Sequence, residues 1–112
     1  MLNQSGALDR TYAALASPAR RSMIERLARG PASVSELAGP LEMSLPAALQ
    51  HLRLLERSGL VASRKAGRVR TFRIETRRLD AATAWLARQR ALWDQRFDRL
   101  DAVLRESEET DE

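Results

Sequence analysis

The side chains best suited to chemistry are the arginines and polar groups between Met43 and Arg78. This stretch holds nine Lys or Arg against two Glu, a net charge of +7. The whole chain carries only +4, so the positive charge is concentrated here. Guanidinium groups offer planar forks of N–H donors that suit phosphate and guanine. The segment therefore predicts a surface for a polyanion, with duplex DNA as the expected partner.

A capped helix followed by a basic hairpin would hold these side chains in place. Ser44 is a preferred N-cap, Pro46 suits a first helical turn, and Gly59 suits the left-handed position that ends a helix. Strands are expected over residues 60–65 and 69–74, joined by a short turn. This order predicts a mainly α fold with a small β-hairpin, a winged helix-turn-helix of about five helices plus a two-stranded wing.

The outward face of the helix after Ser44 is the expected DNA-contacting surface, because a major groove admits one helix. From this helix we expect DNA contacts by Ser44, Pro46, Ala47, Gln50, His51 and Arg53. Helical spacing places the opposite side in the core, at Leu45, Ala48, Leu49, Leu52 and Leu55. Gln50 can pair with adenine through two hydrogen bonds, and Ala47 can touch a thymine methyl group. The alternative is a solvated helix face, and His51 is equally suited to a structural hydrogen bond.

Four cations lie along the hairpin and its tip: Arg64, Lys65, Arg68 and Arg70. A hairpin beside a groove-binding helix can lay such side chains on phosphates or into the minor groove. Strand neighbours point to opposite faces, so not all four can meet DNA. Arg20, in the first turn of an expected second helix, is a further candidate for phosphate. A solvated run of charge is the alternative.

Local signals mark the earlier helices. Apolar spacing predicts a first helix over residues 7–16. Ser17 and the proline after it start a second helix, which runs to about Arg29. A capping box formed by Ser33 and Glu36 opens a short third helix.

A last helix is expected from Thr76 to about Arg105. At 1.5 Å per residue it would be about 43 Å long, more than so small a domain can cover. Its apolar stripe favours an identical chain as partner, and a helix folded back on its own core is the alternative. The expected dimer interface comprises Leu8, Tyr12, Leu79, Leu86, Trp93, Phe97, Leu100 and Leu104.

The chain of 112 residues shows no repeat and no linker, which predicts one domain. We expect a disordered N-terminus over residues 1–6, a winged helix-turn-helix DNA-binding and dimerisation domain over 7–105, and an acidic disordered tail over 106–112. Residues 1–80 carry 14 positive and 7 negative side chains, whereas residues 81–112 carry 5 and 8. The basic part would therefore face the partner.

Several classes of function are disfavoured by the composition. The chain has no cysteine, which excludes disulfides and thiolate metal sites. It has no glycine-rich phosphate loop and no histidine–carboxylate cluster, so we do not expect an enzyme. No apolar run approaches the roughly 18 residues that span a bilayer, and the first residues lack a signal-peptide pattern. We expect no cofactor, no membrane association and a cytoplasmic location.

Three segments carry the most specific pattern: LASPARRSMIERLARGPASVSELA, MSLPAALQHLRLLERSGLV and RKAGRVRTFRI. Over about residues 8–104 the chain resembles the ArsR/SmtB family of bacterial transcriptional repressors. The stretch from His51 to Val61, followed by a basic wing, is the most telling part. The resemblance implies a homodimer, paired through its first and last helices, that represses by covering a promoter until an inducing signal releases it. By position, Ser44 to His51 match the family's DNA-binding helix and Arg64 to Arg70 its wing.

The chain departs from the family pattern in operator contacts and in sensing. Leu49 stands where a small polar residue is common and Gln50 where a basic one is common, so operator preference is expected to differ. Metal-sensing members place cysteines on the third helix, where this chain has Ala38 and Pro40, or His and carboxylates on the last helix. With no cysteine and one histidine, metal sensing is not expected. Three aligned carboxylates could hold a hard cation, but surface ion pairing explains them better: Asp94, Asp98 and Asp101.

The preferred function is a sequence-specific DNA-binding transcriptional repressor that acts as a homodimer on a palindromic promoter operator and senses no metal. The alternative is a protein-interaction or dimerisation module on a winged-helix scaffold without specific DNA binding, which an outward Leu54 and the apolar last helix allow. The inducing signal stays open between a small apolar molecule, a partner protein and protein level alone. Trp85, Trp93 and Phe97 could line a pocket for such a molecule, although a dimer core is the preferred explanation.

Overall fold

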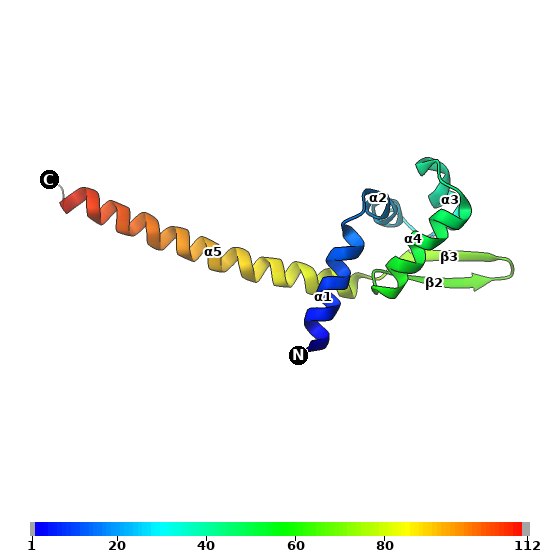
Figure 1. Cartoon of the computed structure of the whole chain (residues 1–112), viewed down its shortest axis with the longest axis horizontal. Coiled ribbons are helices and arrows are strands. Elements are labelled where there is room, and N and C mark those ends of the chain that lie inside the picture. The colour runs from blue at the N-terminus through cyan, green and yellow to red at the C-terminus, as the bar shows by residue number, and fades with distance from the viewer. Residues whose placement is uncertain (1, 111–112) are drawn as a thin grey trace. The chain divides into compact units, whose positions relative to one another are not determined.

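The computed structural model describes residues 2–110 and has the predicted mainly α, winged helix-turn-helix architecture (Figure 1). In chain order the elements are α1 (Leu2–Leu15), α2 (Pro18–Leu27), β1 (Ala32–Ser33), α3 (Val34–Ala38), the 3-10 helix η1 (Gly39–Leu41), α4 (Leu45–Arg57), β2 (Val61–Ala66), β3 (Val69–Ile74) and α5 (Thr76–Thr110). Internal contacts group the chain into two compact units, residues 1–81 and 82–112.

Both chain ends are more helical than expected. α1 begins at Leu2, so residues 2–6, for which we expected disorder, are helical. α5 continues to Thr110, so residues 106–110 are helical as well. Residue 1 and residues 111–112, which the same two predictions cover, lie outside the described residues.

Hydroxyl side chains set the starts of α2 and α4, as predicted. Ser17 Oγ accepts the backbone N–H of Arg20 at 3.3 Å, and Ser44 Oγ accepts that of Ala47 at 3.2 Å. Both capping serines have extended backbone, and a proline lies in the first turn of each helix. Proline has no backbone N–H, but the N–H groups of a first turn have no partner within the helix, so no hydrogen bond is lost. The start of α4, the helix that the sequence predicts to contact DNA, is therefore fixed by local geometry.

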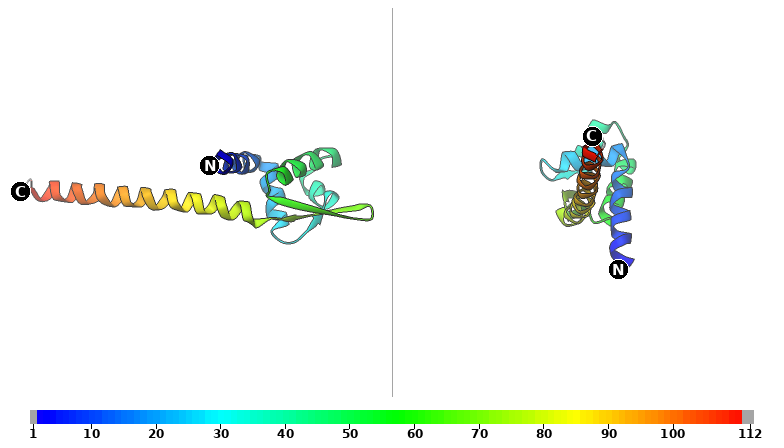
Figure 2. Two further views of the ribbon diagram at one scale, coloured as in Figure 1. Left: turned by 90° about the horizontal axis from the view of Figure 1, so that it is seen from below. Right: turned by 90° about the vertical axis from the view of Figure 1, so that its left-hand side faces the viewer.

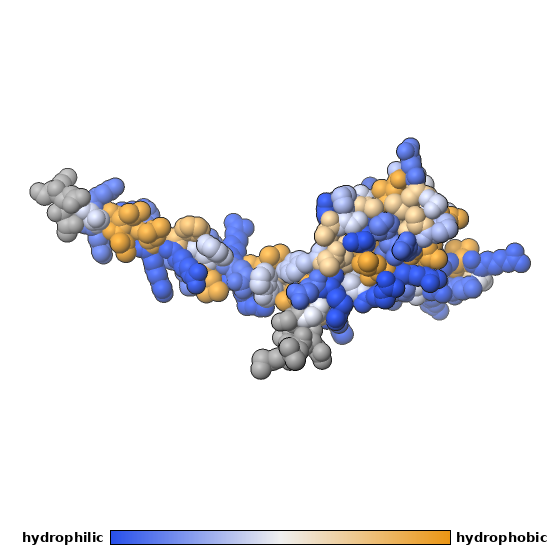
Figure 3. Space-filling view, in the orientation of Figure 1, coloured by the Kyte–Doolittle hydropathy of each residue, from blue (hydrophilic) through white to orange (hydrophobic). Residues whose placement is uncertain are grey.

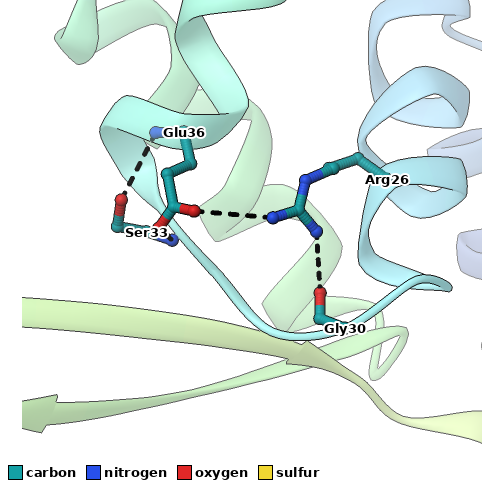
Figure 4. A network of polar contacts seen from close by, with 4 residues as sticks. All are labelled: Arg26, Gly30, Ser33 and Glu36. Atoms are coloured by element: carbon teal, nitrogen blue, oxygen red, sulfur yellow. Dashed lines mark hydrogen bonds and ion pairs between the residues drawn. The ribbon is translucent and has the colours of Figure 1, made fainter.

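A polar network joins α2 to the start of α3 (Figure 4). Ser33 and Glu36 form the predicted capping box, with the Ser33 hydroxyl accepting the Glu36 N–H and the Glu36 carboxylate accepting the Ser33 N–H. Arg26 lies 3.5 Å from Glu36 Oε2 and donates to the carbonyl of Gly30 at 3.0 Å. The Ser33 N–H lowers the pKa of Glu36 most, followed by the Ser33 hydroxyl and the charge of Arg26. The network fixes the loop that leads into α3.

Gly59 ends α4, as predicted, in the left-handed conformation with φ of +82°. Its N–H donates to Glu56 O and the N–H of Leu60 donates to Leu55 O, both at 3.0 Å. This pair of bonds is the Schellman ending, which satisfies the last carbonyls of a helix. A side chain here would also collide with Arg78, whose Cγ lies 2.9 Å from the position of a Cβ. The helix therefore stops sharply and the chain turns into β2.

The hairpin gains a third strand at its base. The sheet is antiparallel in the order β1–β3–β2, with Ala32 opposite Phe72 and Ser33 opposite Thr71. We predicted a two-stranded wing and missed β1. The short strand ties the loop before α3 to the hairpin. The left view of Figure 2 shows the hairpin of β2 and β3 projecting past α4.

The strand register decides which hairpin face meets the core. Ser63 pairs with Phe72 and Lys65 with Arg70, so these four side chains share one face. Phe72 is completely buried, so this face packs on the core at its base and carries Lys65 and Arg70 farther out. Arg64 points to the opposite face, as the alternation of strand neighbours predicts.

The core of the first unit collects apolar side chains from α1 through β3. Its buried members are Ala14, Met23, Leu27, Ala32, Leu37, Ala38, Ala48, Leu52, Leu55, Leu60, Val61 and Phe72. One prediction on α4 was wrong. Leu45 was expected in the core but is 53% exposed, because it lies in the first turn, where none of the described residues covers it. Helical spacing placed Leu54 outward, with packing under the hairpin as the alternative, and Leu54 is half-buried against the core; Leu49, expected in the core, is half-buried against it as well.

Candidate nucleic-acid interface

One side of α4 faces solvent. Ser44, Pro46, Gln50 and Arg53 are exposed along it, and Ala47 is half-buried at its edge. This is the side that the sequence assigned to DNA, and no described segment packs over it. Gln50 therefore has its amide available for a base edge.

Arg20 and His51 contact each other behind this surface. Arg20 Nη1 lies 3.3 Å from His51 Nδ1, which places α2 in contact with α4. The same guanidinium donates from Nε to Ala14 O at 2.7 Å and from Nη2 to Ala13 O at 3.2 Å, at the end of α1. The Arg20 side chain is thus engaged inside the protein, and His51 is half-buried. This contact favours the structural role for His51.

An open groove runs between α4 and the outer half of the hairpin. Its lining includes four cationic side chains from these two elements, Arg53, Lys65, Arg68 and Arg70, with Leu49 among them. Within residues 2–110, the side chains of Arg53, Lys65 and Arg68 make no hydrogen bond or ion pair. Hydrophilic residues cover the hairpin tip in the space-filling view (Figure 3). The groove therefore offers cations whose charge the protein does not neutralise.

A second groove adjoins the first and contains a chain of hydrogen bonds that sequence analysis missed. Glu56 and Arg57 line it together with Arg70. Ser63 Oγ donates to Glu56 Oε2 at 2.6 Å, and Arg70 Nη1 donates to Ser63 Oγ at 2.8 Å. We call this chain the Glu56 relay. The one available signal was that Glu56 is the only acidic residue in residues 43–74.

The second unit, residues 82–112, presents apolar side chains to solvent. In Figure 3 hydrophobic residues recur along α5. The exposed ones are Leu86, Leu92, Trp93, Phe97, Leu100, Val103 and Leu104, each at least half exposed. The rings of Trp93 and Phe97 contact each other, with centroids 6.0 Å apart. Of the other residues predicted for the dimer interface, Leu8 and Tyr12 are half-buried, and Leu79 packs against the core of the first unit.

No three His, Asp, Glu or Cys side chains of residues 2–110 come together in a way that could hold a metal ion. Asp101, one of the three aligned carboxylates, instead pairs with Arg105 at 2.8 Å. Among the helices of residues 2–110, none combines the length and the apolar character needed to cross a membrane.

The fold and this surface define the class of a winged helix-turn-helix DNA-binding protein. A family model described as a helix-turn-helix domain matches residues 15–64. The HTH-type transcriptional regulator Rv2034 of Mycobacterium tuberculosis is 46% identical over 67 residues. That alignment covers 60% of this chain and 63% of the regulator, less than two thirds of its length.

Solved structures extend the likeness to nearly the whole chain. The crystal structure of an ArsR family transcriptional regulator is 46% identical, with a TM-score of 0.74, over 84% of this chain and 94% of that one. A homodimeric winged helix-turn-helix DNA-binding domain from Mycobacterium bovis, described as a possible ArsR-family regulator, is 26% identical, with a TM-score of 0.58, over 88% and 85%. This chain belongs to the ArsR family of winged helix-turn-helix transcriptional regulators, which confirms the predicted family and fold class.

Proposed function

We propose that this ArsR-family regulator is a sequence-specific repressor that acts as a homodimer on a palindromic operator and does not respond to metal ions. The observation that carries the proposal is the continuous surface made by the exposed side of α4 and the basic groove beside it. Arg53, Lys65 and Arg68 have no partner among the described residues, and a phosphate backbone would supply one.

In this proposal α4 lies in the major groove while the hairpin meets the flanking backbone. Gln50 contacts a base edge and Ala47 approaches a thymine methyl group, while Ser44 contributes to phosphate at the helix start. Arg53, Lys65, Arg68 and Arg70 take phosphate contacts, and Arg64 reaches the backbone from the other hairpin face. At about −0.9 per phosphate contact, these five cations on one half-site would give a slope of about −4.5 in log affinity against log salt concentration.

A second copy of the chain would complete the repressor. The exposed apolar side chains of α5 supply a surface that a second copy can bury, and the Mycobacterium bovis relative is homodimeric. Two α4 helices spaced about 34 Å apart would bind two half-sites of a palindrome. Bound across a promoter, such a dimer would exclude the transcription machinery. The composition supports an inducer other than a metal ion, because thiolate ligands are lacking.

The test is to capture the protein from cells with its bound DNA, sequence that DNA, and titrate the recovered site. We expect one inverted repeat to be enriched and to bind with sub-micromolar affinity, well above a scrambled duplex of equal length. Equal affinity for the two duplexes at moderate salt would contradict the proposal. Gln50→Ala should change the base preference at one position of each half-site, and an unchanged preference would show that α4 is oriented differently.

The second candidate, a protein-interaction module without specific DNA binding, now depends on α5 alone. Leu54, which also supported it, is half-buried against the core. The exposed apolar side chains of α5 keep the candidate open. A partner captured in nuclease-treated extract, together with DNA affinity that does not vary with salt, would favour it over the repressor.

A further inference from the structure

The Glu56 relay links the three elements that form the proposed DNA surface. Glu56 lies on α4, Ser63 on β2 and Arg70 on β3, joined by hydrogen bonds of 2.6 and 2.8 Å. We propose that Glu56 is a positioning residue that sets DNA specificity: through Ser63 it holds Arg70 and the hairpin at one spacing from α4, and its charge weakens binding to unmatched duplexes. This inference rests on the proposed function and names a determinant of that same site.

The donors and acceptors of the relay fit only one direction. A serine hydroxyl has one proton to donate and lone pairs to accept with. Ser63 gives its proton to the Glu56 carboxylate and accepts from the Arg70 guanidinium, so a charged group stands at each end. Hydrogen bonds to charged groups are shorter and stronger than neutral ones. The relay therefore fixes the orientation of both the hairpin and the Arg70 side chain.

The carboxylate lies where it opposes polyanion binding. Glu56 lines one groove with Arg53, Arg57 and Arg70, cations that a DNA backbone would approach. A phosphate on these arginines would stand within about 8–10 Å of Glu56, the range over which salt leaves charges coupled. Non-specific binding depends on phosphate neutralisation alone, so it loses most from a nearby negative charge. A matched operator also gains base contacts with α4, which compensate.

The fixed spacing acts in the same direction. A hairpin held by hydrogen bonds is ordered before DNA arrives, so a duplex of matching shape binds without a further loss of freedom. A duplex whose backbone lies elsewhere must break the relay to reach Arg70. Specificity thus arises partly by penalising the wrong partner.

The experiment measures the specificity ratio, the affinity for the operator recovered from cells divided by that for a scrambled duplex, at one salt concentration. Glu56→Ala removes both charge and relay, and Ser63→Ala removes the relay without changing charge. Ser63→Thr keeps the hydroxyl. Glu25→Ala, at an exposed position on α2, makes the same charge change away from both grooves.

We expect Glu56→Ala, which loses both the charge and the relay, to raise affinity for scrambled DNA about threefold and to lower the ratio by about threefold to ninefold. Ser63→Ala should lower the ratio about threefold through weaker operator binding, with scrambled DNA unaffected. Ser63→Thr and Glu25→Ala should keep the wild-type ratio. An unchanged ratio in Glu56→Ala or Ser63→Ala would overturn the inference and leave the proposed function standing. A wild-type protein with no operator preference would instead remove the proposed function itself.

Discussion

The two units of the chain treat their apolar side chains in opposite ways. Residues 1–81 bury Leu52, Leu55 and Phe72 completely and leave most of their cations exposed. Residues 82–112 leave Trp93 55% exposed and Phe97 58% exposed. The first unit closes its own core, whereas the second lacks enough neighbours among its own residues to do so.

The two units therefore present surfaces suited to different partners, one cationic and one apolar. In the proposed function the cations of the first unit bind DNA, because each phosphate contact releases counterions condensed on the duplex. The apolar side chains of the second call for another apolar surface, because burying them removes their contact with water. The arginines of the first unit also differ among themselves. Arg20 donates hydrogen bonds to two carbonyls and contacts His51, whereas the side chains of Arg53 and Arg68 have no partner within residues 2–110.

The largest effect is expected on the apolar surface. Trp93→Asp with Phe97→Asp should convert a dimer into a monomer, because four buried aromatic side chains per dimer are lost. At about 1.5 kcal/mol or more each, the loss of at least about 6 kcal/mol corresponds to roughly four orders of magnitude in the dissociation constant. Sedimentation equilibrium measures the change.

The control for this loss of dimerisation is a single aspartate elsewhere on α5. Gln95→Asp introduces the same acidic group into the same stretch of α5, at a position outside the exposed apolar set. It should leave the dimer intact. A double aspartate variant that still sediments as a dimer would show that α5 does not hold the two copies together.

The next largest effect is expected on the stability of the first unit, from the hydrogen-bonded Arg20. Arg20→Ala removes the guanidinium donor to the Ala14 carbonyl and to His51 Nδ1, and it leaves the Ala13 carbonyl with the Ala16 N–H alone. We expect a loss of about 1–3 kcal/mol in the free energy of unfolding, measured by urea denaturation. Arg29→Ala, at an exposed position just before Gly30, should lower the free energy of unfolding little. Equal free energies of unfolding for the two variants would show that the hydrogen bonds of Arg20 do not stabilise the fold.

Arg68→Ala should have the converse effect. It breaks no internal bond, so stability should stay unchanged, while affinity for every duplex falls and the salt slope of the dimer becomes shallower by about 2, one contact for each half-site. Arg64→Ala is the matched variant, since Arg64 lies on the opposite hairpin face from the groove. We expect its salt slope to change less. Equal changes for the two variants would mean that the hairpin meets DNA with both faces equally.

The smallest effect concerns pH. The pKa of Glu36 lies below its ordinary value of 4.5, chiefly because of the Ser33 N–H, so the ionised form stabilises the fold. This contribution is complete above the unfolded pKa and is lost as pH falls through the lower folded pKa. The difference in Tm between wild type and Glu36→Gln should therefore shrink between about pH 6 and about pH 3. A difference that stays constant would show that the carboxylate charge contributes nothing.

Local signals predicted the helix boundaries that position the site. Ser17, Ser33 and Ser44 each cap a helix, and Gly59 ends one, because each of these motifs closes within a few residues of chain. The alternation of strand neighbours also predicted that the four hairpin cations could not all share one face. These features need no knowledge of the distant parts of the fold.

Features set by distant contacts could not be predicted in this way. The strand β1 exists only through its pairing with Thr71 and Phe72, nearly forty positions along the chain. The engagement of Arg20 by His51 and the hydrogen bond from Ser63 to Glu56 depend on how helices and sheet pack. Leu45 lies in the apolar sector of its helix, yet its burial depends on a neighbour that the first turn lacks.

The most direct test of the account is to map backbone amide shifts by NMR when the operator duplex is added to the full chain. We predict that the largest shifts fall in the first turns of α4, around Gln50, and at the hairpin tip, around Arg68. The amides of residues 92–104 on α5 should move little. Shifts concentrated on α5, with α4 and the hairpin unaffected, would contradict the claim that the basic groove and the exposed side of α4 bind DNA.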